Sequence, residues 1–163
     1  MKKNLTTATL LLAALALCFP GPAAVAQAQN NKPSARVAVL LEETGYPYSK
    51  AADNVWAIDF QGKSMPKFNV IASTHEDVLV LFTIVAEKDS LRLTPGVIQK
   101  LLQLNGDLDR VKIGIDKDGD LFVRTDLSIR VLDVREMKEN IEQVAAATDV
   151  VYATVKSSIG GPK

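Results

Sequence analysis

Apolar residues recur at every second position along the first half of the chain, which is the spacing of β-strands with one buried face. This spacing predicts strands at residues 54–60 and 67–73, each with its apolar side chains on one side. Residues 78–86 are apolar on both faces, so they predict a third strand near the centre of the sheet. The alternate apolar positions of the first two strands are Trp56, Ile58, Phe60, Phe68, Val70 and Ala72.

Two shorter helices are predicted where apolar residues recur at steps of three and four. Ser34 is expected to cap the first of them, and Gly45 is expected to end it. Thr94 is expected to cap the second helix, with Pro95 at the first helical position, where a missing amide proton costs nothing.

A β-hairpin is predicted after the second helix, which Asn105 and Gly106 are expected to end. The dipeptide Asp118-Gly119 lies between two alternating apolar runs, which is a strong signal for a tight hairpin turn. The alternating positions of these two strands are Val111, Ile113, Ile115, Leu121 and Val123.

The last predicted element is a long helix with an apolar stripe. Asp133 and Glu136 resemble a capping box at its start. The stripe could cover a sheet or pack on a second copy of itself, since sustained three-and-four spacing is also typical of coiled coils. Sheet packing is favoured, because the stripe has no leucine and the strands need a cover. The stripe consists of Val134, Met137, Ile141, Val144, Thr148, Val151 and Val155.

These elements predict an α+β domain with an antiparallel sheet of about five strands packed against helices, in the order α-β-β-β-α-β-β-α. We expect a single domain at residues 34–159, a flexible tail at 27–33 and a disordered C-terminus at 160–163. The domain is long enough to bury a core without disulfides.

Residues 1–26 differ from the rest of the chain and predict an export signal. A basic start, a short apolar run and a small-x-small end are typical of such signals. Cleavage is expected after Ala26, with Ala28 as the second choice, and the product would lie in the periplasm or outside the cell. Cys18, the one cysteine, lies in this segment; the bulky Leu17 before it argues against a lipidated cysteine.

Removal of the signal leaves 17 basic residues, since Lys2 and Lys3 are lost from 19, against 19 acidic residues. The resulting net charge of about −2, with the signs well mixed, gives no electrostatic case for binding nucleic acid or an anionic membrane. No later segment is expected to insert into a membrane.

Two motifs of the second half carry a family resemblance: the helix end LLQLNG, and the hairpin KIGIDKDGDLFVRTDL that precedes the long capped helix. With them, the chain from about residue 35 to 159 resembles the YbjN-type domain, which is similar in fold to type III secretion chaperones. The positions that match are Leu101, Leu102, Leu104, Asn105, Gly114, Asp116 and Asp118–Asp120. The resemblance implies a small α+β domain and frequent dimers. Secretion chaperones bind extended segments of client proteins in the cytoplasm, so the signal peptide departs from their pattern.

Candidate catalytic and metal-binding groups each have a simpler interpretation. Asp116–Asp120 has the composition of a calcium loop, but counted from Asp116 the glycine is at position four and Leu127 at position twelve, so the EF-hand pattern fails. His75 is the one histidine and lies in a predicted turn. A triad of Ser73, His75 and Asp77 would join close neighbours that cannot line up for catalysis. No cofactor or metal is therefore predicted.

The sequence thus predicts an exported binding module that is not an enzyme. It would bind a protein or peptide segment, or a second copy of itself, through the sheet surface. The alternative is a small apolar or lipid-like ligand held between sheet and helix. Arg124, Thr125 and Asp126 form a string that recurs in the family, and a strand-end ion pair is the preferred interpretation. The candidate contact residues are Trp56, Ile58, Phe60 and Phe68, with Val151 and Val155 if the last helix lies at a dimer interface.

Overall fold

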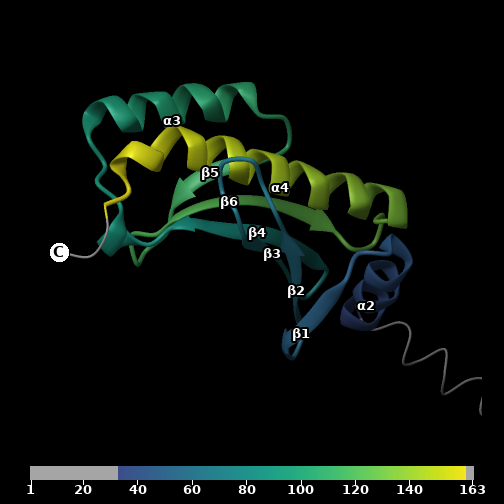
Figure 1. Ribbon diagram of the computed structural model, residues 1–163. Helices are drawn as coiled ribbons and strands as arrows, with labels where there is room; N and C mark the ends of the chain where they lie inside the picture. The colour runs from purple at the N-terminus through teal and green to yellow at the C-terminus, as the bar shows by residue number, and fades with distance from the viewer. Residues whose placement is uncertain (1–32, 161–163) are drawn as a thin grey trace, which may run out of the picture.

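The computed structural model describes residues 33–160, which form one antiparallel sheet with helices along one face and at one end (Figure 1). The predicted order of helices and strands is confirmed, with one additional strand. In chain order the elements are α2 (Pro33–Thr44), β1 (Tyr48–Ala52), β2 (Val55–Phe60), β3 (Phe68–His75), β4 (Val78–Ala86), η1 (Lys88–Ser90), α3 (Pro95–Asp107), β5 (Lys112–Ile115), β6 (Leu121–Ser128), α4 (Val134–Val155) and η2 (Lys156–Ser158).

The sheet has six strands in the order β1-β2-β3-β4-β6-β5, where about five were predicted. The additional strand is β1, whose residues are exposed or half-buried, so they lack the alternation that marks a strand in sequence. Asn54 makes the β1–β2 hairpin possible because it adopts a left-handed backbone conformation, with φ of 60°. The apolar strand β4 lies between β3 and β6, which confirms its predicted central position.

Helix α4 runs across the sheet and buries its apolar stripe against it (Figure 1). Met137, Ile141, Val144, Val151 and Val155 are fully buried, and the strands facing them contribute side chains that are as inaccessible. Sheet packing, the favoured alternative for this stripe, is what the structure shows. The facing strand residues with less than about a tenth of their surface exposed are Trp56, Ile58, Phe68, Val70, Ala72, Leu79, Leu81, Leu121 and Val123.

The predicted caps of α3 and α4 are confirmed by their hydrogen bonds. Thr94 accepts a bond from the backbone N–H of Val97, and Asp133 accepts one from the N–H of Glu136. The side chain of Glu136 is engaged elsewhere, with Arg110 at 2.7 Å. Helix α3 continues through Asn105 and Gly106 to Asp107, one residue beyond the predicted end of the helix, and Leu108 still donates a backbone hydrogen bond to Leu104.

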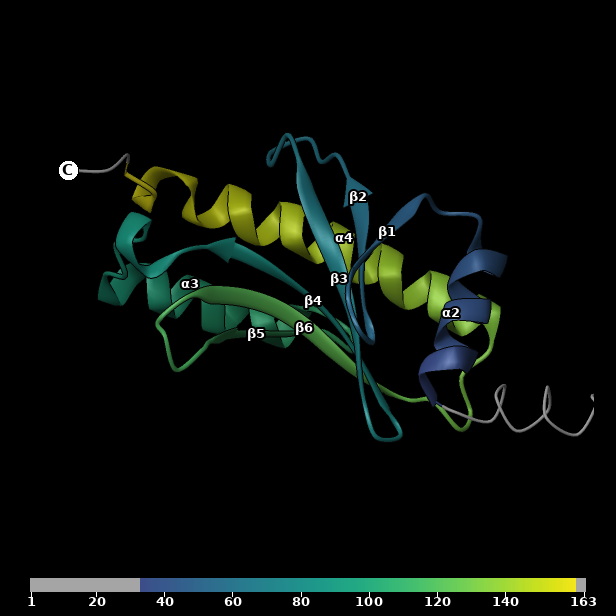
Figure 2. The same cartoon turned by 90° about the horizontal axis from the view of Figure 1, so that it is seen from below.

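Helix α2 lies at the β1 end of the sheet and is fastened to α4 (Figure 2). It ends where predicted, since Gly45 adopts φ of 75°. Arg36 donates to the carbonyl oxygen of Leu132 at 2.8 Å, and the Tyr46 hydroxyl donates to Glu142 at 2.6 Å. Burial together with the hydrogen bond to Glu142 raises the pKa of Tyr46 to about 12.

The loop between β2 and β3 is held against α4 by one carboxylate. Asp149 accepts hydrogen bonds from the backbone N–H groups of Ser64 and Met65, at 2.7 and 2.8 Å. A β-carbon at Gly62 would lie 2.1 Å from the same carboxylate, so only glycine allows this close approach. The N–H groups of Met65 and Ser64 hold the pKa of Asp149 below its ordinary value.

Candidate functional site

The face of the sheet turned away from α4 is not covered by any helix or strand of the described residues (Figure 2). Side chains alternate between the two faces of each strand, so this open face carries the residues that the core does not use. Its centre is apolar and half-buried. The open face comprises Val55, Ala57, Ile71, Ser73, Val80, Phe82, Ile84, Lys112, Phe122, Arg124 and Asp126.

A shallow hollow of about 250 Å³ lies in the centre of the open face. Its floor is made by Val80, Phe82 and Ile84 of β4 and by Phe122 of β6, and Arg124 lies at its rim. The pairing of the strands explains this grouping, because Phe82 faces Arg124 and Ile84 faces Phe122 across the β4–β6 ladder. The hollow therefore combines four apolar side chains with the guanidinium of Arg124, the carboxylate of Asp116 and the hydroxyl of Ser73.

Phe122 can lie low on the sheet because the residue opposite it on β5 is Gly114. A β-carbon at Gly114 would approach the ring of Phe122 to 2.5 Å, which is closer than side chains pack. A glycine inside a strand often marks such a close approach. The glycine of the KIGI motif thus shapes one wall of the hollow.

Three charged side chains form a network beside the hollow, on neighbouring strands. Asp126 accepts from Nε of Arg124 at 2.6 Å with one oxygen, and its other oxygen pairs with the ammonium group of Lys112. Partial burial raises the pKa of Asp126, but the hydrogen bonds from Lys112 and Arg124 outweigh it and hold the pKa below its ordinary value. The carboxylate is ionised at neutral pH and fixes both cations.

The alternation of side chains along β6 explains the Arg124-Thr125-Asp126 string. Arg124 and Asp126 point to the open face and form the expected ion pair, while Thr125 points to the covered face and is almost fully buried. The hydroxyl of Thr125 donates to the carbonyl oxygen of Arg110 at 3.0 Å, which fastens the turn before β5. Arg110 itself adopts φ of 59° in that turn.

A second apolar surface lies between α3 and β5, at the far edge of the sheet. Ile98, Leu102 and Ile115 expose 44%, 68% and 45% of their surface there, around a groove of about 230 Å³. Asn105 of α3 binds the outer edge of β5. Its side-chain oxygen accepts a hydrogen bond from the backbone N–H of Ile113 at 2.7 Å. This bond occupies one backbone N–H group on the outer edge of β5.

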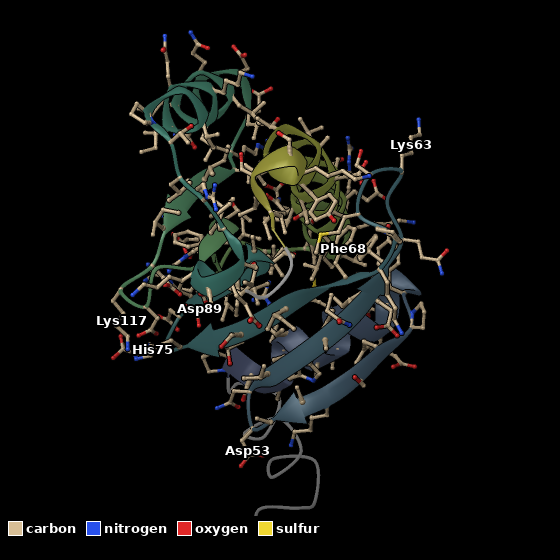
Figure 3. The ribbon with its side chains drawn as sticks, turned by 60° about the vertical axis from the view of Figure 1, so that its left-hand side comes forward. Asp53, Lys63, Phe68, His75, Asp89 and Lys117 are labelled. Atoms are coloured by element: carbon tan, nitrogen blue, oxygen red, sulfur yellow. The ribbon has the colours of Figure 1, made fainter. Side chains whose placement is uncertain are left out.

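The six contact residues predicted from sequence lie mostly in the core. Trp56, Ile58, Phe68, Val151 and Val155 expose at most 6% of their surface, and Phe68 lies between the sheet and α4 (Figure 3). Phe60 is half-buried, with its ring 6.0 Å from that of Phe68 and 5.5 Å from that of Tyr46. A surface for a partner cannot be built from the five buried side chains while α4 stays in place. The candidate surface is the opposite face of the same strands.

The residues weighed for catalysis and metal binding are not assembled into a site. His75 projects from the exposed end of β3 (Figure 3), and no hydrogen bond joins it to Ser73 or Asp77 in the described part of the chain. The Asp116 side chain accepts the backbone N–H groups of Asp118 and Asp120, so it organises the predicted hairpin turn. Within residues 33–160, no cluster of three or more His, Cys, Asp or Glu is placed to hold a metal ion.

The layer between the sheet and α4 is filled by side chains. Ile141, Val144 and Thr148 of α4 are fully buried against Leu81 and Val123 of the sheet. The alternative of a small apolar ligand between sheet and helix stays a prediction, since this layer is filled whereas the groove between α3 and β5 is open. Across the same part of the chain, every helix is too short or too polar to cross a membrane.

Comparison with known proteins agrees with this architecture. A family model for YbjN, described as "Putative bacterial sensory transduction regulator", matches residues 33–157. A search of curated proteins finds no match. The predicted export signal lies outside the described residues.

Several solved structures have the same fold at low sequence identity. The heterodimeric ExoU–SpcU complex of the type III secretion system of Pseudomonas aeruginosa matches at 20% identity and a TM-score of 0.54, covering 73% of this chain and 97% of that chain. The HopA1–SchA chaperone–effector complex matches at 13% and 0.56, covering 74% and 95%. YbjN from E. coli matches at 13% and 0.52, covering 78% and 94%. At these identities the likeness establishes the fold.

Proposed function

Because the chain belongs to the YbjN family, we propose that it is a non-enzymatic module that binds a segment of another protein on the open face of its sheet. The observation that carries the proposal is the apolar centre of that face, which no described element covers. Apolar surface of this kind on a sheet is typical of an interaction site.

The structural neighbours support a protein as the partner. Two of them are complexes between two proteins, and one of these is named as a chaperone with its effector. The shape of the hollow points the same way. At about 250 Å³ and open to solvent, it is smaller than most sites for small molecules, which run to about 300–1,000 Å³. It is suited to one or two side chains of a partner.

Photo-crosslinking in the native host tests the proposal. A photoreactive residue at position 80 would lie on the open face, and the same residue at position 150, on the exposed outer side of α4, is the matched control. We expect position 80 to give adducts with a specific protein and position 150 to give none of them. Equal adducts from both positions, or none from position 80, would contradict a binding role for this face.

Export completes the proposed function. The signal-like residues 1–26 support it, and the product would act in the periplasm or outside the cell. N-terminal sequencing of the protein from its host is the test. We expect the chain to begin at Gln27, or at Gln29 if cleavage follows Ala28. An intact Met1 in the purified protein would contradict it.

Self-association is a second candidate, favoured by the exposed apolar groove between α3 and β5. Leu102 is the most exposed side chain of that groove, so Leu102→Glu would place a charge where a second copy would pack. Light scattering should then show a shift from dimer to monomer. Val131→Glu is the control, since Val131 exposes 82% of its surface away from this groove. A native protein that is monomeric at all concentrations would contradict this candidate.

A further inference from the structure

The residues that line the hollow in the open face determine which side chains of a partner can bind there. Its floor is apolar, with Phe82, Ile84 and Phe122 presenting ring and methyl groups to solvent. Aromatic and branched apolar side chains are the usual anchors of protein interfaces, because they bury much surface for little lost freedom. A partner should therefore place an apolar side chain here.

The charged groups at the rim of the hollow differ in how many of their hydrogen-bonding atoms are free. Arg124 uses Nε to bind Asp126, and its two terminal nitrogens form no hydrogen bond with any described residue. Asp126 has both oxygens engaged by Arg124 and Lys112, so it offers little to a partner. The other carboxylate at the rim is Asp116, which accepts two backbone N–H groups from its own turn, both with the same oxygen, Oδ1. The terminal nitrogens of Arg124 thus offer unused donors beside the hollow.

Resting on the proposed function, we propose that the open face selects extended segments in which an apolar side chain is followed two residues later by a carboxylate. The apolar side chain enters the hollow, and the carboxylate accepts from the terminal nitrogens of Arg124. Alternate side chains of an extended chain lie on the same side, about 6.6 Å apart. Facing residues of β4 and β6, such as Phe82 and Arg124, offer the two required contacts side by side.

Capped peptides of defined sequence test the selection directly. The probes are STFTETS, with Phe and Glu two residues apart, and two matched forms, STFTKTS and STSTETS. Binding is followed by NMR on the labelled protein as its host processes it. We expect STFTETS to shift the amide signals of β4 and β6, and to bind about tenfold more tightly than either matched form.

Charge reversal on the protein gives the second arm. Arg124→Glu should favour STFTKTS over STFTETS, and Arg124→Gln should remove the preference while Phe still binds. Arg135→Glu is the matched control, because it breaks an exposed Arg–Glu pair on α4, away from the open face. It should leave the preference of the native protein unchanged. The glutamine variant keeps the test informative if the reversed charge beside Asp126 unfolds the protein.

Equal binding of STFTETS and STFTKTS, or a preference unaffected by Arg124→Gln, would overturn the selection of acidic segments. Signals that shift along α3 and β5 in place of β4 and β6 would overturn it too. These failures differ from a failure of the proposed function. If position 80 still crosslinks to a protein, the face binds partners by another rule; if it does not, the face is not a binding surface.

Discussion

The two faces of the sheet differ in burial, although the same strands form both: one face is buried and the other is open to solvent. Leu81 and Phe82 are consecutive residues of β4, yet Leu81 is fully buried under α4 while Phe82 remains half-buried on the open face. Both faces are apolar at the centre, so composition does not distinguish them. The difference is that α4 covers only one of them. An apolar face without a cover is better explained by binding than by stability.

Alanine substitutions at the consecutive residues Leu81 and Phe82 should show the largest difference between the two faces of the sheet. Leu81→Ala removes a side chain that is fully enclosed, so it should lower the free energy of unfolding by about 2–5 kcal/mol. Phe82→Ala should cost about 1 kcal/mol or less, because Phe82 is already partly hydrated. Denaturant unfolding of both variants is the measurement. A larger loss for Phe82→Ala would mean that the open face belongs to the core.

The same pair sharpens the comparison when binding is measured. The Phe82→Ala protein should fold normally, but a photoreactive residue at position 80 should no longer crosslink it to the partner. The Leu81→Ala protein, under conditions in which it is folded, should keep these crosslinks. Stability and binding would then be carried by opposite faces of one strand.

Loss of the α4 cap should have an intermediate effect. Asp133→Ala removes the acceptor for the N–H of Glu136, which should lower stability by about 1 kcal/mol. Asp133→Asn keeps an acceptor oxygen and should recover most of that loss. Thermal melts distinguish the two variants. A loss as large as that of Leu81→Ala would show that the cap, rather than burial, keeps α4 on the sheet.

Lowering the pH should have the smallest effect on stability. One carboxylate on each side of the sheet should contribute to that effect. Asp149 and Asp126 have pKa values held below 3.8, so their stabilisation is complete above that value and is lost as the pH falls through the lower folded-state pKa. Asp149→Asn and Asp126→Asn should each be less stable than the native protein at neutral pH. Their melting temperatures should also fall less steeply below about pH 4. Unchanged acid slopes would contradict these assignments.

Much of the fold could be predicted from sequence because burial leaves a periodic pattern. The alternation at Trp56 and Ile58, the central strand β4 and the stripe of α4 all reflect the core, and each was placed correctly. Strand β1 was missed because its residues are exposed and it pairs only at the edge. The end of α3 was placed one residue early, because Gly106 does not adopt the left-handed conformation with which a glycine ends a helix.

The candidate surface was harder to predict, since the strongest apolar pattern marks the core and not the binding face. Trp56 and Phe68 are predicted as contacts because they are apolar side chains of the sheet, and the same apolar character places them under α4. A usable signal was present in β4, where apolar residues occupy both faces, while α4, the one long helix within residues 33–160, can cover a single face. The excess of apolar strand surface over available helix points to Phe82 and its neighbours.

The contact between Gly114 and Phe122 gives this domain a simple route to a different specificity. The ring occupies the place that a methyl group at position 114 would need, so Gly114→Ala would swing the ring outward over the strands. One added carbon would thereby change the size of anchor that fits, without touching the core or the charged network. Relatives that diverge at this position would be expected to accept different partners on the same scaffold.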